Sequence, residues 1–384
     1  MIVLTVCCAF SLLAWVGVLL APHQPHRLRE RLDADAGAPA DLSSVTVLIP
    51  ARDEADVIGR TVAALAAQGE GLAAIVVDDQ STDGTAAAAM AAAAASSGAL
   101  SLCVVCGEPL PTGWAGKLWA LEQGQKLVDR PFVLLLDADI ELGSRFVPTL
   151  LREAQRRNAS LVSIMAELHC ATFWERLLTP AFVFFFKLLY PFAWSNDPRR
   201  RTAAAAGGCM LVRTAALREI GGFSAIRGAL IDDCTLASAL KRAAPPIWLG
   251  VSRSVRSLRA YAALADFWAM VSRSAFTQLR YSGALLILTT VLMFVVLLAP
   301  VAAVAALALG GSAVAIVGAL AWIAMSAAYY SVVRFYRLSS LWALTLPFSA
   351  SLFLAMTWSS AFAYWRGAHG NWKNRSYDRT LAQH

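Results

Sequence analysis

Long and short apolar runs divide the chain into two kinds of region. Runs of about 20 residues, the length that spans a bilayer, occupy Met1–Ala21, Gly283–Leu309, Ser312–Val333 and about Leu341–Trp365. Between them, from about Val45 to Tyr281, short apolar runs alternate with segments of helical periodicity. This pattern predicts a globular α/β domain that lies between membrane helices.

The alternation in the middle of the chain is typical of a doubly wound, mainly parallel sheet. Strands are predicted at Val45–Ile49, Ala73–Val77, Leu100–Val105, Phe132–Leu136, Ser160–Ala166 and Cys209–Val212. Helices are predicted at Asp56–Gln68, Thr85–Ser97, Leu118–Val128, Thr214–Glu219 and Asp232–Arg242. In such a sheet, ligands bind beyond the carboxyl ends of the strands. Polar residues that directly follow the strands are therefore candidate functional residues.

Two further segments are apolar or amphipathic. Phe173–Trp194 is rich in aromatic residues, is interrupted by Pro180 and Pro191, and carries Lys187 midway. A transmembrane span is possible there, but the pattern favours a pair of helices that lie in the membrane interface with their aromatic faces inward. Tyr261–Tyr281 is predicted to be an amphipathic helix.

The predicted organisation follows from these runs. It comprises a transmembrane helix (1–22), a linker (23–44), the α/β domain (45–281), C-terminal transmembrane segments (282–365) and a polar tail (366–384). A cleaved signal peptide fits the first run less well, because the basic n-region is missing and the apolar part is too long.

Basic residues predict the orientation in the membrane. The flank His26–Arg31 is basic and is therefore expected on the cytosolic side, which places the α/β domain in the cytosol at a bacterial-type inner membrane. Arg334 and Arg337, between the last two spans, agree with this orientation. Three C-terminal spans put the tail outside, yet the tail is basic. Either the last segment is re-entrant, with a bend at Pro347, or the charge rule fails here; both alternatives remain open.

Composition narrows the class of protein. The 384 residues are 58% hydrophobic and 15% charged, and the mean hydropathy of +0.56 is too high for an ordinary soluble protein. The net charge of +7 fits basic flanks against an anionic leaflet, and no basic stripe with interleaved aromatics indicates nucleic-acid binding. The seven cysteines have neither disulfide-framework nor zinc-site spacing, since Cys103 and Cys106 form a lone C-x-x-C. All seven are expected to be small buried residues in a reducing compartment.

The strand at Phe132–Leu136 ends at two carboxylates, Asp137 and Asp139. Carboxylates in this position can hold Mg²⁺ or Mn²⁺ while phosphate oxygens and waters complete the coordination. The cation would then act as a Lewis acid on a leaving diphosphate. The alternative is a helix N-cap, because a helical pattern begins soon afterwards at Ser144.

Polar residues also follow the first two strands. The segments Pro50–Glu54 and Asp78–Asp83 offer groups for a nucleobase and for ribose hydroxyls, although the G-x-G-x-x-G loop of dinucleotide sites is missing. Turn and N-cap roles are the alternative, above all for Asp83 before Gly84. The candidate nucleotide contacts here are Pro50, Arg52, Glu54, Asp78 and Asp79.

Two further positions carry candidate chemistry. Lys117 is a possible phosphate contact or, equally, a solvated surface lysine. The like charges of Asp232 and Asp233 tend to raise the pKa of one of them, which suits a general base that removes a proton from an acceptor hydroxyl. A pair of N-cap residues is the alternative.

Six short motifs in order resemble the inverting family 2 glycosyltransferases of the GT-A fold. They are PARDE (50–54), VVDDQSTDGT (76–85), PTGWAGK (111–117), LLLDAD (134–139), GGCMLVR (207–213) and IDD (231–233). The GWAGK element and the C-terminal spans resemble the membrane enzymes that glycosylate lipids, such as the ceramide, carotenoid and especially the hopanoid-associated glycosyltransferases. The resemblance implies a nucleotide-sugar donor, usually a UDP-sugar, a divalent metal and a lipid acceptor such as a hopanoid.

The resemblance also implies roles for individual residues. Asp79 would bind the base and Asp139 the metal, with Asp137 helping at the sugar or the metal. Asp233 would be the catalytic base, preceded by Asp232 where the family usually has glutamate.

A last motif departs further from the family. The segment Thr277–Tyr281 keeps the arginine of the family's Gln/Arg-x-x-Arg-Trp motif, and Arg280 is therefore expected near the diphosphate. Thr277 and Tyr281 replace the first residue and the tryptophan, so their roles stay open.

Two alternatives to a membrane glycosyltransferase remain. A processive polysaccharide synthase would share the sheet, but it should have the tryptophan-bearing motif and more spans. A non-catalytic membrane scaffold that retains the fold is argued against by the intact acidic positions. The expected partners are a nucleotide sugar, a membrane lipid acceptor and the membrane itself, without nucleic acid.

Overall fold

The computed structural model describes residues 1–38, 41–96, 100–244, 246–309 and 312–367, together with the backbone of 371–372 and 375–376. The chain divides into two compact units. The helical unit contains Met1–Arg29, Cys170–Ala193 and Tyr261–His369, and the sheet unit contains Glu30–His169, Trp194–Ala260 and Gly370–His384. Gly310 and Gly311, which separate two of the predicted spans, lie outside the described residues, as do Ser97 and most of the tail.

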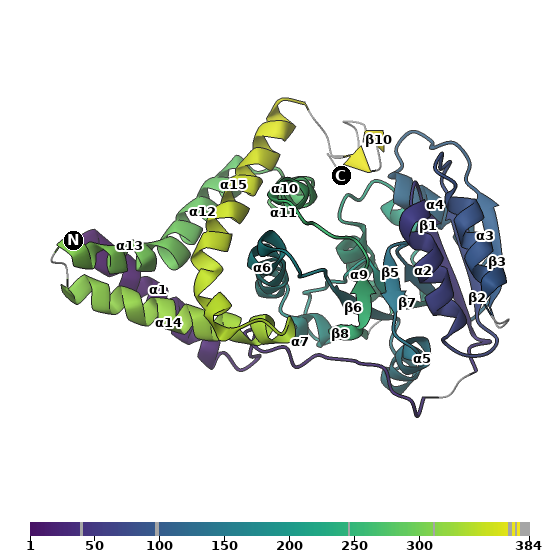
Figure 1. Cartoon of the computed structure of the whole chain (residues 1–384), viewed down its shortest axis with the longest axis horizontal. Helices are drawn as coiled ribbons and strands as arrows, with labels where there is room; N and C mark the ends of the chain where they lie inside the picture. Colours follow the sequence, from purple (N-terminus) through teal and green to yellow (C-terminus); the bar gives the residue numbers. More distant parts are fainter. Residues whose placement is uncertain are drawn as a thin grey trace. The chain divides into compact units, whose positions relative to one another are not determined.

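One mixed, mainly parallel sheet forms the core of the sheet unit (Figure 1). Its strands are β1 Val45–Ala51, β2 Ala73–Asp78, β3 Ser101–Cys106, β4 Phe132–Leu136, β5 Ile140–Leu142, β6 Leu161–Glu167, β7 Cys209–Arg213 and β8 Ile247–Ser257. Their order is β3-β2-β1-β4-β7-β6-β8-β5, with β7 antiparallel to both neighbours and β5 antiparallel to β8. The predicted α/β class is confirmed, whereas β5 and β8 were not predicted.

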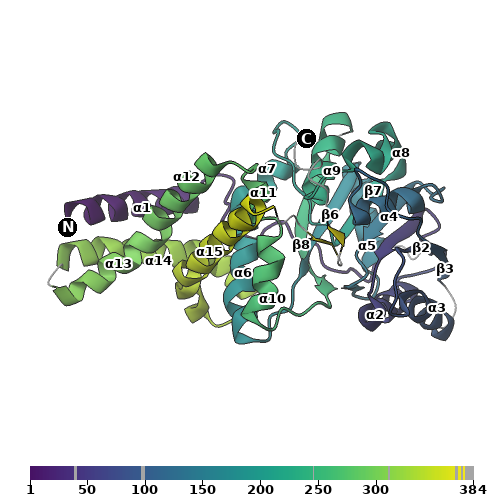
Figure 2. The same cartoon turned by 90° about the horizontal axis from the view of Figure 1, so that it is seen from above.

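Helices cover both faces of this sheet (Figure 2). On one face lie α2 Ala55–Ala66, α3 Thr85–Ala95 and α5 Phe146–Arg157, and on the other α4 Gly116–Gln125, α8 Thr214–Glu219 and α9 Asp232–Ala243. Alternate residues of β1 serve the two faces: Val47 and Ile49 pack on the α2 side and Leu48 on the α4 side. A Cβ at Gly124 would lie 2.2 Å from Leu48 Cδ1, so glycine allows α4 to approach the sheet closely.

Strand direction determines which residues meet at one edge. β1, β2 and β4 are parallel, so their carboxyl ends reach the same edge. β7 runs the other way and pairs Cys209 with Leu136, so the Gly207–Gly208 turn before it arrives at that edge too. We call this the polar edge.

Part of the predicted linker pairs with the sheet. Val251 of β8 donates a backbone hydrogen bond to Glu30 (2.9 Å) and accepts one from Leu32 (3.0 Å). Leu42 is fully buried in the core. This segment is therefore anchored to the sheet unit at both ends.

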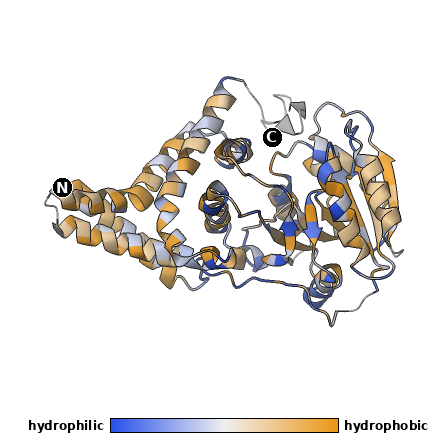
Figure 3. Ribbon diagram, in the orientation of Figure 1, coloured by the Kyte–Doolittle hydropathy of each residue, from blue (hydrophilic) through white to orange (hydrophobic). Residues whose placement is uncertain are grey.

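Within its described residues, the helical unit contains four helical stretches long and apolar enough to cross a membrane (Figure 3). They are Ile2–Leu20, Gly283–Ala308, Ala313–Phe335 and Ser340–Trp365. The helices of this unit are α1 Ile2–Leu20, α6 Phe173–Leu189, α10 Leu264–Ser272, α11 Ala275–Gln278, α12 Gly283–Met293, α13 Ala299–Ala305, α14 Ser312–Phe335 and α15 Leu346–Trp365.

A π-helical turn, Phe294–Leu298, interrupts the second of these stretches. Pro300 has no N–H, so the carbonyl of Val296 loses its usual helical donor. Two side chains of α1 replace it: Ser11 Oγ donates at 2.7 Å and Trp15 Nε1 at 3.0 Å. A polar group left unsatisfied in hydrocarbon is costly, so these bonds stabilise the packing of α1 on this stretch.

The aromatic segment Phe173–Trp194 is helical. Of the two interruptions predicted, at Pro180 and Pro191, only the second is present. Pro180 lies inside α6, and the helix ends only at Tyr190, before the short helix α7 Phe192–Asn196. A capping box between Thr172 and Glu175 begins α6. The interfacial position of these helices stays a prediction.

Two other predictions were wrong. Tyr261–Tyr281 is not one helix, because α10 ends at Ser272 and α11 begins at Ala275. Cys103 and Cys106 are exposed, since β3 is an edge strand of the sheet.

Candidate active site

Acidic and basic side chains from separate segments meet at the polar edge. Asp137 follows β4, Asp232 begins α9, and Lys117 lies in the first turn of α4. Lys117 Nζ lies 2.7 Å from Asp137 Oδ1 and 3.7 Å from Asp232 Oδ2. The fold therefore joins the predicted metal-binding motif to the predicted catalytic pair through one ammonium group.

Asp233 is held by backbone amides on both oxygens. Gly207 N donates to its Oδ2 at 3.0 Å, and Cys234 N donates to its Oδ1 at 2.7 Å. Burial, followed by the neighbouring charge of Asp232, raises the pKa of Asp233 to about 7. A carboxylate of this kind can accept a proton near neutral pH.

The helix-cap alternatives do not describe these carboxylates. The N-cap residue of α9 is Ile231, so Asp232 and Asp233 lie inside the first turn. The helix that follows the Asp137–Asp139 motif, α5, has Arg145 as its N-cap. Neither acidic pair is therefore explained as a helix cap.

Lys117 is not a solvated surface lysine, because its side chain is only 19% exposed. Burial alone would lower the pKa of Lys117, but the carboxylates of Asp137 and Asp232 outweigh it and raise that pKa. Burial also raises the pKa of Asp137, and Lys117 opposes that shift. The ammonium thus stays charged and neutralises part of the acidic site.

Arg259 is a site residue that the sequence analysis did not identify. Its Nε donates to Asp139 Oδ2 and its Nη2 to Glu54 Oε1, both at 2.8 Å. It follows β8, which was not predicted; recognising that strand would have placed Arg259 at the polar edge. This residue after β8 thus joins carboxylates that follow two other strands, β1 and β4.

The loops after β1 and β2 are locked together by hydrogen bonds. Asp53 N donates to Ser81 Oγ (2.9 Å), and Thr82 N donates to Asp53 Oδ1 (3.0 Å). Glu54 N donates to Thr85 Oγ1 (2.9 Å). The left-handed backbone of Asp53, at φ +49°, allows this arrangement.

The predicted nucleotide contacts on this side are placed unequally. Asp79 is fully buried, and the Arg52 guanidinium lies 3.7 Å from its Oδ2, so a ligand reaches Asp79 only if neighbouring groups move. Asp78 is partly exposed and accepts from Ser81 N at 3.1 Å, whereas Pro50 is buried within β1. Their roles in binding stay predictions.

Asp83 has the turn role that the sequence analysis gave as the alternative to ligand binding. Its Oδ1 accepts from Thr85 N at 3.0 Å and its Oδ2 from Ala55 N at 2.9 Å. Both bonds fix the backbone of the turn before α3. Asp83 is therefore a structural residue.

Arg280 lies in the helical unit, after α11, with a left-handed backbone at φ +51°. Its predicted contact with the diphosphate stays a prediction. Thr277 and Tyr281, the two departures from the family motif, contact each other: Thr277 Oγ1 donates to Tyr281 Oη at 3.1 Å. The replaced positions thus form a local pair.

Asp137 and Asp139 fit a cation site in which phosphate oxygens of a bound ligand and waters supply the remaining coordination. Among the described residues no group of three His, Cys, Asp or Glu side chains could enclose a metal ion. Mg²⁺ in phosphate-transfer sites needs only one or two carboxylates, with phosphates and waters as the other ligands. Asp137 and Asp139 supply two such carboxylates at the polar edge.

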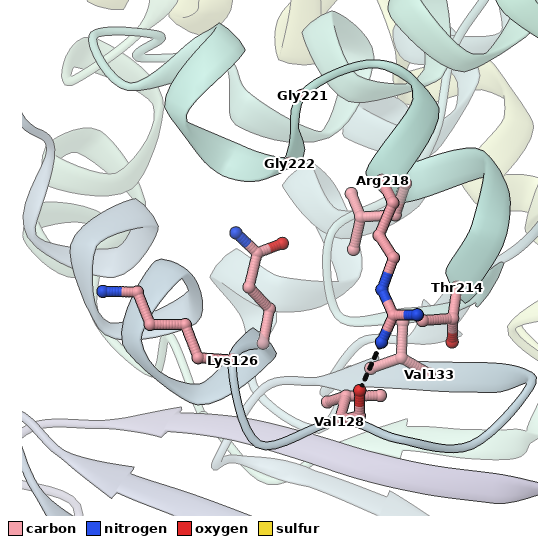
Figure 4. A pocket seen from close by; sticks show the side chains of 9 residues that line it. Lys126, Val128, Val133, Thr214, Arg218, Gly221 and Gly222 are labelled. Carbon is pink, nitrogen blue, oxygen red and sulfur yellow. Dashed lines mark hydrogen bonds between the residues drawn. The ribbon is translucent and has the colours of Figure 1, made fainter.

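A cavity of about 310 Å³ lies at the other edge of the sheet (Figure 4). Val133, near the start of β4, and Thr214, after β7, line it. Arg218 also lines the cavity, and its Nη2 donates to the carbonyl of Val128 at 2.8 Å. Its position separates it from the carboxylates, so it is not part of the candidate active site.

Comparison with solved structures identifies the class of fold. Over 94% of this chain and 99% of the other, the structure resembles the mannosyltransferase PcManGT from Pyrobaculum calidifontis in complex with GDP-Man and Mn²⁺, with a TM-score of 0.58 and 17% sequence identity. Glucosyl-3-phosphoglycerate synthase from Mycobacterium tuberculosis is similar over 65% of this chain and 86% of that chain, with a TM-score of 0.42 and 18% identity. The protein thus has the GT-A type of α/β fold that was predicted.

The sequence assigns the domain more narrowly. Residues 46–221 match the family described as Glycosyl transferase family 2. The predicted enzyme class is confirmed. No curated protein matches the chain.

Proposed function

We propose that the protein is a membrane-anchored, inverting glycosyltransferase that moves one sugar from a nucleotide sugar to a membrane lipid. The observation that carries this proposal is the position of Asp233. Its carboxylate, with a pKa raised to about 7, lies beside the Lys117–Asp137–Asp232 cluster at the polar edge of a family 2 domain. A base and a phosphate-binding cluster are thereby brought together.

The donor binds at the polar edge, where the chain offers carboxylates for a cation and basic side chains for the diphosphate. Asp137 and Asp139 hold Mg²⁺ or Mn²⁺, which when bound stabilises the charge of the leaving diphosphate. Lys117 contacts the diphosphate, and the loops after β1 and β2 bind the nucleoside. PcManGT, which shares the fold, was solved with GDP-Man and Mn²⁺. A UDP-sugar is the donor we propose for this chain, and a GDP-sugar is the alternative to test.

Asp233 acts as the general base. It takes the proton of the acceptor hydroxyl, and the oxygen attacks the anomeric carbon on the side opposite the diphosphate. The bond between that carbon and the diphosphate oxygen breaks as the new glycosidic bond forms, and the nucleoside diphosphate leaves. Configuration inverts in one displacement, without a covalent sugar–enzyme intermediate.

The acceptor is a lipid, which we propose to be a hopanoid or a related isoprenoid lipid. Four apolar helical stretches and the aromatic helix α6 support a membrane-dissolved acceptor. The basic flank at His26–Arg31 supports a domain on the cytosolic face of the inner membrane.

The test is product analysis with the purified full-length protein in nanodiscs. Bacterial lipid extract, Mn²⁺ and a panel of UDP- and GDP-sugars are supplied, and lipids are analysed by mass spectrometry. A lipid that gains the mass of one sugar with wild type, but not with Asp233→Asn, supports the proposal. A polymer would indicate a processive synthase, and no binding of any nucleotide sugar would indicate a non-catalytic scaffold.

A further inference from the structure

The two carboxylates proposed to hold the cation are each paired with a basic side chain of the chain itself. Lys117 Nζ lies 2.7 Å from Asp137, and Arg259 Nε donates to Asp139 Oδ2 at 2.8 Å. We infer that Arg259 is an exchangeable counter-ion: it holds Asp139 until a divalent cation binds, and it then pairs with the diphosphate of the donor. This inference rests on the proposed function, because it requires the cation and the diphosphate.

The contacts of Arg259 are those of a counter-ion. Its guanidinium donates to Glu54 and Asp139, whose side chains are 13% and 16% exposed. Carboxylates this far from water are costly unless they are paired. The Arg259 side chain is itself 38% exposed, so it has room to change partners. A single side chain therefore stabilises both acids while the ligands are absent.

The charges of the polar edge favour such an exchange. Lys117 and Arg259 each pair with two carboxylates there: Lys117 with Asp137 and Asp232, and Arg259 with Glu54 and Asp139. A divalent cation at Asp139 would lie close to the guanidinium, and like charges at that distance repel. A diphosphate instead attracts a guanidinium, which can bind phosphate oxygens in pairs. Arg259 thus opposes the cation alone and favours the cation together with the diphosphate.

Other roles for Arg259 predict a different pattern. If it only oriented Asp139 for the metal, its loss would weaken metal binding, as is usual for groups that support a metal ligand. If it were only a surface ion pair, its loss would change neither affinity. The exchange alone predicts changes of opposite sign for the cation and for the nucleotide.

The test is Arg259→Gln in the full-length protein, with binding as the readout. Removal of the competing charge should tighten binding of Mn²⁺ alone, measured by electron paramagnetic resonance, by a factor on the order of ten. Binding of UDP or GDP at saturating Mn²⁺, measured by calorimetry, should weaken by a similar factor. Arg259→Lys keeps the positive charge but cannot bind two phosphate oxygens side by side as a guanidinium does. It should recover part of the nucleotide affinity.

Arg256→Gln is the matched control. Arg256 lies on β8, its side chain is 59% exposed, and it pairs with Glu167 at 3.8 Å, so the variant loses the same charge without touching Asp139. Both affinities should stay near wild type in this variant. An equal tightening of Mn²⁺ in Arg256→Gln would overturn the inference, because it would show an effect of net charge.

Asp139→Asn separates failure of the inference from failure of the proposed function. If this variant loses Mn²⁺ while Arg259→Gln binds Mn²⁺ like wild type or more weakly, the exchange is wrong and the metal site stands. If wild type binds Mn²⁺ no better than Asp139→Asn, the proposed cation site is wrong and the inference falls with it. Thermal unfolding of each variant confirms that it is folded.

Discussion

The two sides of the polar edge are held in different ways. On the side of β1 and β2, hydroxyl groups and backbone amides lock the loop backbones, as in the 2.9 Å bond from Glu54 N to Thr85 Oγ1, and the ion pairs from Arg52 to Asp79 and Asp53 are longer, at 3.7 and 4.0 Å. On the side of β4 and β8, the contacts are ion pairs, from Lys117 to Asp137 (2.7 Å) and from Arg259 to Asp139 (2.8 Å). Neutral bonds within a loop respond little to the charge of a ligand, whereas ion pairs redistribute when charge arrives. We therefore expect a rigid nucleoside side and a responsive diphosphate side.

The largest effect is expected at the base. Asp233→Asn removes the proton acceptor but keeps the size of the side chain. The rate of sugar transfer should fall by about 10³-fold, while the dissociation constant of UDP, measured by calorimetry, stays within a factor of about three because the diphosphate side is intact. Loss of donor binding together with transfer would contradict the assignment of Asp233 as the base.

The ion pairs of the diphosphate side can be disrupted by replacing Lys117. Lys117→Gln leaves Asp137 and Asp232 without their shared counter-charge, which destabilises a partly buried acidic pair. Thermal unfolding should shift down by about 5 °C, and UDP binding should weaken. Lys117→Gln combined with Asp137→Asn should unfold at a higher temperature than Lys117→Gln alone, because one of the two carboxylates left without a counter-charge is then neutral. No recovery in the double variant would show that Lys117 acts mainly through other contacts.

The pH dependence sharpens the contrast between the two members of the catalytic pair. The pKa of Asp233 is raised to about 7, and the base acts only when deprotonated, so kcat/KM should rise with pH and level off near that value. In Asp232→Asn a neighbouring negative charge is lost, which lowers the pKa of Asp233. The rising limb should therefore move to lower pH in this variant. An unchanged limb would show that another group controls it.

The smallest effect is expected on the rigid side. Thr85→Val removes the acceptor of the Glu54 amide and should cost about 1 kcal/mol of stability, seen as a small decrease in the unfolding temperature. Mn²⁺ affinity should stay at the wild-type value, since no charge changes. A shift in Mn²⁺ affinity as large as that of Arg259→Gln would show that the two sides are not independent.

Much of the sheet could be predicted because continuous apolar runs identify buried strands. β1, β2, β4 and β7 appear where such runs were found, and the polar residues after them reach one edge. β8 was missed because its second half, up to Ser257, is rich in serine and arginine, and its pairing with β6 and β5 is a tertiary property. Arg259 was missed with it.

Other features depend on packing that a local pattern does not contain. Pro180 was expected to interrupt a helix, yet it is buried within α6, where tertiary contacts outweigh the local cost of proline. The side chain of Asp79 is fully buried with Arg52 folded toward it, a position that the sequence did not indicate, and its contact with a nucleobase stays a prediction. Both outcomes depend on neighbours distant in the sequence or on the direction of a long side chain.

The place of β8 in the sheet also affects how the protein is made. β5 pairs Ile140 with Ser257, and Asp139 accepts a backbone hydrogen bond from Leu258 at 2.7 Å. During translation the stretch around Asp139 therefore emerges long before the strand that completes it. Until the ribosome has passed residue 258, the nascent chain carries its carboxylates on an unfinished edge, while the N-terminal helix α1 is already available to the membrane.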